Sequence, residues 1–374
     1  MTTRIRTLLG PLISGNQIRY GVPTPFSYYS SYKYSEDVAD MPGVDHPVWL
    51  VSRTANFSGM NGGSVGTPGS AFYRYGNHAP PDGVNNLANA THVSLPALPS
   101  YAAMATMVRA RTNPSRASVG IPVALAELRD IPRTLRMSKD SRLTGFASKE
   151  NLRIQFGWMP LISDVCKLLS FASTVEKRSE MIRRMIANGG LRRKVNLYHD
   201  VVVEKDSDLF LNSGAAMVQH ASSEKITTRN VWGTTRWVPS TYLAGMDDRD
   251  RANYIRRTVL GLTASQQFAN AWNAVPWTWL IDWFANVGDL LEASNNSIAH
   301  TSGSACIMEH THTRVVYTAT TGGWMIPGSK SYVTLTEKRR TLSSSGFSAS
   351  LPFLSGRQLS ILGSLAILKF KGRR

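Results

Sequence analysis

Apolar and polar positions alternate with a period of two in three separate parts of this chain, and that period is typical of half-buried β-strands. Strand-forming Tyr, Val, Trp and Thr side chains are frequent in the same parts, whereas the Gly-rich stretch Ser58–Ser70 predicts a loop. The predicted strands lie in Phe26–Tyr34, Val48–Ser52, Ala71–Tyr75, the region 191–240, Ser304–Thr321 and Lys330–Arg340.

Between these parts, apolar residues recur at steps of three and four, which predicts helices. The clearest helix covers Met159–Asn188, and Asn188-Gly189-Gly190 is a stop signal at its end. A second stripe of large apolar residues covers Thr263–Ala293. Further helices are predicted at Tyr101–Arg111, through Leu125, Leu128 and Leu135 with an interruption at Pro132, and at about Ser355–Phe370.

The order of these blocks is β, α, β, α, β, α, with several strands in each β block. Regular alternation of one strand with one helix would be typical of a parallel sheet, so this order argues against such a sheet. The sequence therefore predicts an elongated α+β protein with an antiparallel β-sheet region and a helix-bundle region, each assembled from discontinuous segments. The β-rich region is expected in 1–97, 190–262 and 300–345, and the helical region in 98–189, 263–299 and 346–374.

The charge balance is the strongest signal in the composition. The chain has 42 Lys and Arg against 25 Asp and Glu, a net charge of +17 and an isoelectric point near 10.1. A protein this basic repels itself unless a polyanion neutralises it. Nucleic acid is the commonest polyanion and an anionic membrane surface is the second candidate, so the composition favours a nucleic-acid partner.

Other features of the sequence limit where the protein acts. The two cysteines, Cys166 and Cys306, make no disulfide framework, which fits synthesis in a reducing cytoplasm. The amino-terminal apolar run is broken by Gly10 and Pro11, so we expect no signal peptide. The carboxy-terminal tail contains Arg357 and several polar residues. It lacks about 20 clean apolar residues, and we expect no membrane span.

Two Trp-containing stretches carry a family resemblance. Residues 151–165 read Asn-Leu-Arg-Ile-Gln-Phe-Gly-Trp-Met-Pro-Leu-Ile-Ser-Asp-Val, and residues 271–290 read Ala-Trp-Asn-Ala-Val-Pro-Trp-Thr-Trp-Leu-Ile-Asp-Trp-Phe-Ala-Asn-Val-Gly-Asp-Leu. Both resemble the signature helices of the maturation proteins of single-stranded RNA bacteriophages. In that family Gln-Phe-Gly-Trp-x-Pro opens one helix and Pro-Trp-x-x-x-x-Asp-Trp-Phe lies in another, in this order. Elsewhere the similarity is one of architecture, basicity and length.

The chemistry of these two motifs is structural. A proline in the first helical turn, such as Pro160, loses no needed hydrogen bond, and the tryptophans supply apolar area to a bundle core. Asp164 and Asp282 could instead be paired catalytic carboxylates, but nothing nearby resembles a substrate pocket, so we expect no enzyme. The motif residues are Phe156, Gly157, Trp158, Pro160, Asp164, Pro276, Trp277, Asp282 and Trp283.

His310, His312 and Arg314 alternate on a predicted strand and should therefore share one face. A metal site there would need a further ligand at useful spacing, which the sequence lacks. An exposed strand face that meets RNA or solvent is favoured over a metal site. No zinc-finger spacing or nucleophile elbow appears, and we expect no cofactor.

The basic residues occur in clusters that have two interpretations. Each cluster by itself can be a solvated face. Together they need a polyanion, and folded RNA is recognised through its shape and phosphates, with looped bases stacking on aromatic and Arg side chains. The residues predicted to bind RNA are Arg129, Arg133, Arg136, Lys139, Arg183, Arg184, Arg192, Arg193, Lys194, Arg314, Lys338, Arg339, Arg340, Lys369 and Lys371.

The resemblance implies the remaining functional expectations. Maturation proteins take one position in the coat shell, bind the genomic RNA and attach to a host pilus, so one copy per virion is expected. The β-rich end usually projects from the shell and the helical end lies inside with the RNA. The implied receptor surface comprises the loop Ser58–Ser70 and the tyrosines Tyr28, Tyr29, Tyr32 and Tyr34.

We therefore expect a virion protein, made in the host cytoplasm, whose partners are the viral genomic RNA, the coat shell and the pilin of a host pilus. The alternative is a cellular structured-RNA-binding protein, such as a ribosome-associated factor. That alternative explains the charge but leaves the two Trp-rich stretches unexplained. A coat gene and a replicase gene just downstream would decide for the phage protein.

Overall fold

The computed structural model describes residues 3–19, 22–38, 45–56, 62–64, 73–76, 92–118, 171–212, 219–260, 262–263, 287–296, 298–319, 330–346 and 360. The chain forms two compact units, each assembled from three separated segments. Unit 1 comprises Met1–Pro99, Asn196–Gly233 and Cys306–Leu342. Unit 2 comprises Ser100–Val195, Thr234–Ala305 and Ser343–Arg374.

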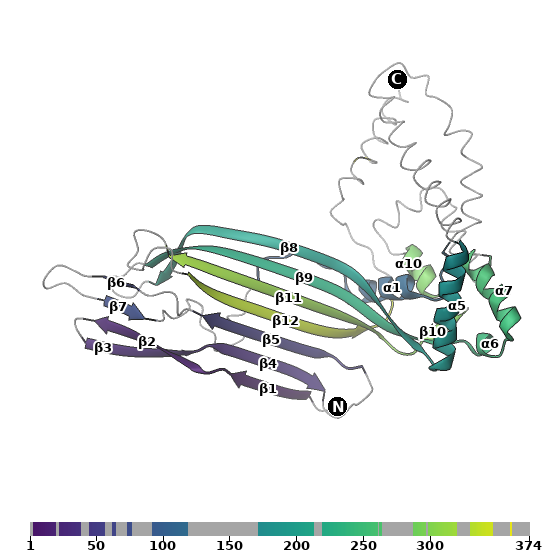
Figure 1. Ribbon diagram of the computed structural model, residues 1–374, viewed down its shortest axis with the longest axis horizontal. Helices are drawn as coiled ribbons and strands as arrows, with labels where there is room; N and C mark the ends of the chain where they lie inside the picture. The colour runs from purple at the N-terminus through teal and green to yellow at the C-terminus, as the bar shows by residue number, and fades with distance from the viewer. Residues whose placement is uncertain are drawn as a thin grey trace, which may run out of the picture. The chain divides into compact units, whose positions relative to one another are not determined.

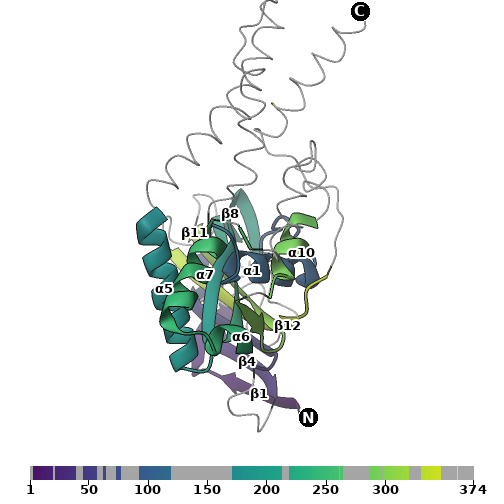
Figure 2. The same ribbon diagram turned by 90° about the vertical axis from the view of Figure 1, so that its right-hand side faces the viewer.

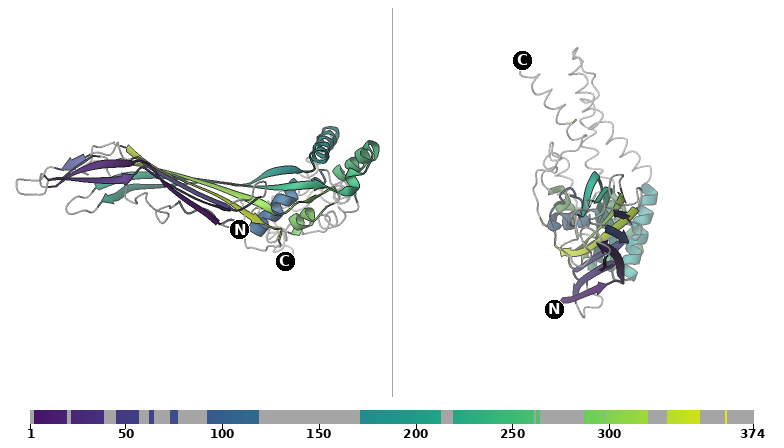
Figure 3. Two further views of the ribbon diagram at one scale, coloured as in Figure 1. Left: turned by 90° about the horizontal axis from the view of Figure 1, so that it is seen from below. Right: turned by 90° about the vertical axis from the view of Figure 1, so that its left-hand side faces the viewer.

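Most strands belong to one eight-stranded sheet with the order β1-β4-β5-β12-β11-β9-β10, in which β8 also pairs with β9 (Figure 1). The strands are β1 Thr3–Leu9, β4 Ser31–Val38, β5 Val48–Asn56, β8 Leu191–Asn212, β9 Gln219–Pro239, β10 Ala299–Thr301, β11 Ala305–Ala319 and β12 Lys330–Ser343. The long strands predicted in the second and third β blocks are confirmed. The sheet is twisted, as Figure 3 shows, and its described registers are antiparallel.

A second, four-stranded sheet has the order β3-β2-β7-β6 and refines two predictions. Its strands are β2 Leu12–Arg19, β3 Val22–Tyr29, β6 Gly62–Ser64 and β7 Tyr73–Gly76. The strand structure predicted at Phe26–Tyr34 is confirmed but divided between two strands, because the chain passes at Ser30 from β3 into β4 of the other sheet. The predicted loop Ser58–Ser70 contains β6, since its pairing with β7 outweighs the low strand propensity of glycine.

The two faces of the large sheet differ in exposure. Along β11 the side chains of Thr311, Thr313 and Val315 are buried, whereas those of His312 and Arg314 are exposed. Across β5 and β12, the register pairs Ala55 with Val333 and Arg53 with Leu335, and all four residues are buried. The exposed face predicted for His310, His312 and Arg314 is therefore confirmed for His312 and Arg314, whereas His310 is half-buried.

Residues 92–99 are hydrogen-bonded to residues of β9 in this sheet. The amide of Val93 donates to Thr227 Oγ1 at 3.2 Å, and Arg229 donates to the carbonyl oxygen of Pro96 at 2.6 Å. The Val93 side chain is itself buried. The segment thus covers apolar and threonine side chains that the strands alone would leave in solvent.

The described helices all belong to unit 2 and are α1 Tyr101–Thr112, α5 Phe171–Ala187, α6 Thr241–Ala244, α7 Asp248–Val259 and α10 Val287–Ala293. The helix predicted at Tyr101–Arg111 is confirmed, and Ser100 caps it by accepting from the amide of Ala103. Helices α6 and α7 correct the assignment of 190–262 to the β-rich region. Asp247 caps α7, whose first turn is acidic and whose last turn contains Arg256 and Arg257, as the helix dipole favours.

The end of α5 confirms the predicted stop signal. Gly189 has a φ of +58°, which glycine adopts without the steric penalty of a side chain. The amide of Gly190 donates to Met185 O at 2.8 Å and that of Gly189 donates to Ile186 O at 3.2 Å. These two bonds form a Schellman motif that satisfies the last helical carbonyls and turns the chain into β8.

Unit 2 is built around one apolar cluster, whose central member is the fully buried Trp237 on β9. Helices α5 and α7 pack together beside it (Figure 2). The buried members are Ile182, Met185, Trp237, Leu243, Ile255, Val259, Ile298 and Ala299. Burial of side chains this large contributes roughly 1.5–3 kcal/mol for each one.

Several predicted helices lie outside the described residues. They are the first part of Met159–Asn188, the segment of Leu125, Leu128 and Leu135, most of Thr263–Ala293, and Ser355–Phe370 apart from Ser360. The predicted helix bundle depends on these segments. Among the described residues, no helix is long and apolar enough to cross a membrane.

Candidate nucleic-acid interface

The two units differ strongly in charge. Unit 2 contains 28 of the 42 Lys and Arg and 13 of the 25 Asp and Glu, so it carries +15 of the net charge of +17. Unit 1 contains the remaining 14 basic and 12 acidic residues and carries only +2. A partner that is attracted by positive charge therefore meets its main electrostatic target on unit 2.

On α5, the predicted RNA-binding residues Arg183 and Arg184 are exposed, and both contact Glu180. Arg184 Nε donates to Glu180 Oε1 at 2.7 Å, and Arg183 forms an i,i+3 ion pair with the same carboxylate. The hydrogen bond from Arg184 is the main reason that the pKa of Glu180 is lowered. Together with Lys177 and Leu191, these side chains line an open hollow of about 920 Å³. Glu176 also lines the hollow, so two carboxylates face three cations and this surface keeps a small positive charge.

On β8, three consecutive predicted residues divide between the two faces of the strand. Arg192 and Lys194 are exposed, whereas Arg193 is half-buried and donates to the carbonyl oxygen of Thr112 at 2.7 Å. Burial lowers the pKa of Arg193. Arg193 therefore supports the end of α1, and its two neighbours remain directed to solvent.

Arg178, which the sequence did not single out, is the most deeply buried of these arginines. Its guanidinium contacts the carbonyl oxygen of Pro114 and donates to Ser118 Oγ at 3.1 Å. Burial, together with the nearby charges of Arg193 and Arg116, lowers its pKa to about 10. At neutral pH the group still carries its charge. Helix α5 contains three arginines, and the sequence pattern does not distinguish the inward-facing Arg178 from the exposed Arg183 and Arg184.

The basic residues of β11 and β12 lie on unit 1. Arg314 and Lys338 are exposed. Arg340 is 3.7 Å from the carboxylate of Asp45, so its charge is largely matched. Arg339 lies over the ring of Trp49, with 5.4 Å between its Cζ and the ring centroid.

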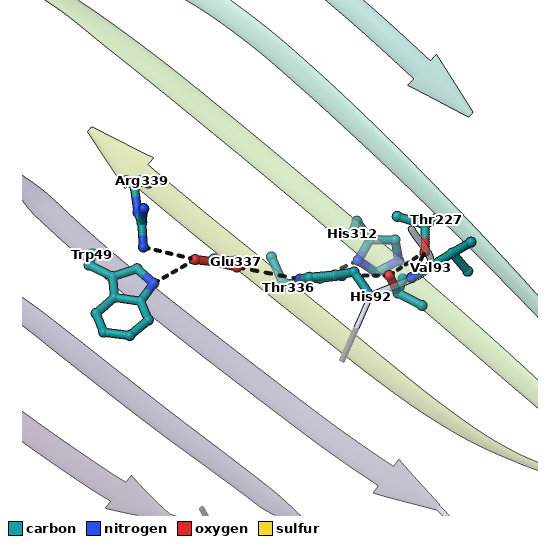
Figure 4. A network of polar contacts seen from close by, with 9 residues as sticks. Trp49, His92, Val93, Thr227, His312, Thr336, Glu337 and Arg339 are labelled. Atoms are coloured by element: carbon teal, nitrogen blue, oxygen red, sulfur yellow. Dashed lines mark hydrogen bonds and ion pairs between the residues drawn. The ribbon is translucent and has the colours of Figure 1, made fainter. Parts of the chain in front are cut away.

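Glu337 connects Arg339 to a longer polar network on the same unit (Figure 4). Its Oε1 accepts from the indole of Trp49 at 2.7 Å and its Oε2 lies 3.6 Å from His92 Nε2. The other ring nitrogen of His92 is 2.6 Å from Thr313 Oγ1. The contact with His92, followed by those with Trp49 and Arg339, lowers the pKa of Glu337. Arg339 is thus one part of a structural cluster.

The four tyrosines predicted to meet a receptor have different environments. Tyr28 and Tyr32 are buried, with 5% and 7% of their surface exposed. Tyr29 is half-buried. Tyr34 packs edge-on against Trp49 with 5.3 Å between ring centroids and donates to Glu36 at 3.1 Å. Alternation along β4 explains the burial of Tyr32, because its register partner Arg53 also faces inward.

The remaining predicted site residues lie outside the described residues. They are the RNA-binding candidates Arg129, Arg133, Arg136, Lys139, Lys369 and Lys371 and all nine motif residues, Phe156, Gly157, Trp158, Pro160, Asp164, Pro276, Trp277, Asp282 and Trp283. Within the described part of the chain, no group of three or more His, Cys, Asp or Glu side chains could hold a metal ion.

Sequence reasoning also missed the exposed residues Tyr242, Arg256 and Arg257 of α6 and α7. A signal for α7 was available. Asp247 stands before Asp250 at the spacing of an N-terminal cap, and the Arg pair follows near the end of the helix. The positions of Ile255 and Val259, four residues apart, complete the helical pattern.

The protein is thus a basic α+β protein, in which the unit that contains the described helices is strongly charged and the β-rich unit is nearly neutral. Residues 102–317, more than half of the chain, match the family described as phage maturation protein. The chain belongs to this family, whose members are structural and attachment components of the phage virion. The matched range includes both Trp-containing stretches. No curated protein matches the chain.

Proposed function

We propose that this chain binds the structured genomic RNA of its phage, mainly through unit 2. The observation that carries the proposal is the location of +15 of the net charge of +17 on that unit. Phosphates dominate the affinity of proteins for nucleic acid, and Lys and Arg supply the matching charge. Membership in a virion protein family favours viral over cellular RNA as the partner.

The same proposal assigns attachment to unit 1. We infer that the protein takes one position in the coat shell as a single copy, and that unit 1 contacts the host pilus from which RNA entry begins. Its small net charge and its exposed aromatic and aliphatic side chains suit a protein partner better than a polyanion. Tyr29 and Tyr34 are candidates for this surface, whereas the buried Tyr28 and Tyr32 support it from within.

Salt dependence tests the RNA-binding proposal. For about 6–10 phosphate contacts, the affinity of the purified protein for its genomic RNA falls roughly 10³–10⁵-fold between about 50 and 200 mM salt. Replacing Arg192 and Lys194 by Gln should reduce the slope of log affinity against log salt by about 2. The matched control replaces the exposed Lys33 and Lys330 of unit 1 by Gln and should leave the slope almost unchanged.

Two results would contradict the proposal. An affinity that does not respond to salt would mean that phosphates are not the target. An equal loss of slope in the two double variants would mean that the charge of unit 2 has no special role. Filter binding or fluorescence anisotropy with labelled genomic fragments measures both quantities.

A further inference from the structure

Residues of α6 and α7 and of the turn between them line an open hollow on unit 2. None of the basic clusters predicted from the sequence includes it. Its volume is about 1080 Å³, at the upper end of the roughly 300–1,000 Å³ of ordinary ligand pockets. The lining includes Tyr242, Asp250, Asn253, Tyr254, Arg256 and Arg257. Aromatic rings and guanidinium groups therefore share one concave surface.

The two tyrosines form the aromatic part of the hollow. Their ring centroids are 6.0 Å apart and the ring planes meet at 80°. Tyr254 is partly buried because it packs against the apolar cluster around Trp237, so its ring is held in place. The side chain of Tyr242 remains 66% exposed and contributes nothing to that core. The exposed Tyr242 ring therefore offers a flat apolar face, and its edge-to-face contact with the partly buried Tyr254 holds it beside the core.

The charges of the hollow are ordered along α7. Asp250, Asn253, Tyr254 and Arg257 occupy positions i, i+3, i+4 and i+7, so they lie on one face of the helix. From Asp250 to Arg257 the helix rises about 10 Å. Asp247 and Asp250 lie at the start of this face, and the Asp247 carboxylate is bonded to the amide of Asp250 at 2.7 Å. One end of the hollow is thus acidic and the other basic.

The basic end is not neutralised within the described part of the chain. Arg256 contacts only the amide oxygen of Asn253, at 3.4 Å, and Arg257 forms no ion pair with any described residue. Both side chains are exposed. An anionic group of a ligand would therefore be drawn to this end, away from the aspartates.

We propose that this hollow binds an unpaired nucleotide of RNA, with its base stacked on Tyr242 and its phosphate at Arg256 and Arg257. The proposal rests on the proposed RNA-binding function and assigns it a specific site. Base stacking on aromatic rings next to Arg is how proteins recognise looped bases, whereas bases inside a duplex are not accessible to such a platform. Asn253 and Asp250 lie where they can accept hydrogen bonds from the amino groups of a base.

The test compares Tyr242→Ala with the wild-type protein on two RNAs of equal length. One is a hairpin of the genomic RNA with an unpaired loop, and the other is a fully paired duplex. We expect the affinity for the hairpin to fall roughly 5- to 150-fold and the affinity for the duplex to remain within about twofold. Tyr242→Phe should retain the wild-type affinity because the ring is preserved. Arg256→Gln with Arg257→Gln should reduce the salt slope for the hairpin by about 2.

Tyr332→Ala is the matched control, because it removes an exposed tyrosine from β12 of unit 1. Unchanged thermal unfolding of Tyr242→Ala would show that the exposed side chain acts in binding and not in folding. If the wild-type protein binds hairpins with normal salt dependence but Tyr242→Ala binds equally well, the nucleotide site is wrong and the RNA-binding proposal survives. If the wild-type protein binds neither RNA, the proposed function itself fails. Loss of coat-shell incorporation without loss of hairpin affinity would assign the hollow to a protein partner and overturn the site.

Discussion

The two units use arginine in different ways. Two of the less exposed guanidiniums of unit 1 meet carboxylates: Arg229 donates to Asp200 Oδ2 at 2.6 and 2.9 Å, as well as to Pro96 O, and Arg340 pairs with Asp45. Two arginines of unit 2 meet backbone carbonyl oxygens instead. Arg193 donates to Thr112 O, and Arg178 contacts Pro114 O.

The difference changes how much charge these four arginines present. A carboxylate satisfies the hydrogen bonds of a guanidinium and cancels its charge. A carbonyl oxygen satisfies the hydrogen bonds but leaves the full positive charge in place. Unit 2 therefore uses arginines as internal supports without losing their long-range field, which suits a surface that attracts a polyanion. In unit 1, Arg229 and Arg340 instead form ion pairs in which a carboxylate cancels their charge.

The largest expected effect on stability concerns the apolar cluster around Trp237 in unit 2, the unit that contains Arg178 and Arg193. Trp237 is fully buried and donates to Thr112 Oγ1 at 3.1 Å, next to the carbonyl that Arg193 binds. We expect Trp237→Ala to lower the free energy of unfolding by about 3–5 kcal/mol, as a core deletion does. Trp237→Phe keeps most of the apolar area and should lose far less. Urea denaturation measures both, and an unchanged stability of Trp237→Ala would show that unit 2 does not depend on this core.

A direct comparison of the two kinds of arginine should give a smaller effect. Arg229→Met leaves the mostly buried Asp200 without its cation and should lower the free energy of unfolding by about 2–3 kcal/mol. Arg178→Met leaves no described carboxylate unpaired and relieves the repulsion with Arg193 and Arg116, so about 1 kcal/mol is expected. Adding Asp200→Leu to Arg229→Met should restore most of the loss. A larger cost for Arg178→Met than for Arg229→Met would refute the distinction between the units.

The smallest effects are opposite pH dependences of two glutamates. The pKa of Glu337 in unit 1 is lowered, so its contribution to stability is present above about pH 4.5 and is lost as the pH falls. Burial raises the pKa of Glu292 in unit 2, and its buried Oε2 has no hydrogen-bond partner among the described residues. The protonated form of Glu292 therefore destabilises the fold least. Its ionisation lowers the free energy of unfolding as the pH rises through the raised pKa.

Substitution by Gln separates the two glutamates. At pH 7, Glu337→Gln should destabilise the protein and Glu292→Gln should stabilise it, each by on the order of 1 kcal/mol. Both differences should shrink toward pH 4. Thermal unfolding between pH 7 and pH 4 measures them, and a shift of the same sign in both variants would contradict the assignment.

The sequence pattern predicted the features that depend only on neighbouring residues in the chain. The glycines at 189 and 190 end α5, and alternation placed His312 and Arg314 on one exposed face. The strand division at Ser30 was not predictable, because Tyr and Ser continue on both sides and only the pairing of β4 with β5 separates the sheets. The site was predicted less well. Arg192 and Lys194 were found by their charge, whereas Tyr242 and Arg257 belong to a helix that the strand pattern next to it obscured.

The sequence by itself determined the family, through two Trp-containing motifs, and the surplus of positive charge, because both depend only on which residues are present. Tertiary structure decided where that charge is effective. Segments far apart in the chain gather +15 on one unit, and long-range packing turns Arg178 and Arg193 inward toward carbonyls while it leaves Arg192 and Lys194 in solvent. Burial and hydrogen-bond partners depend on contacts between distant segments, and no local pattern encodes them.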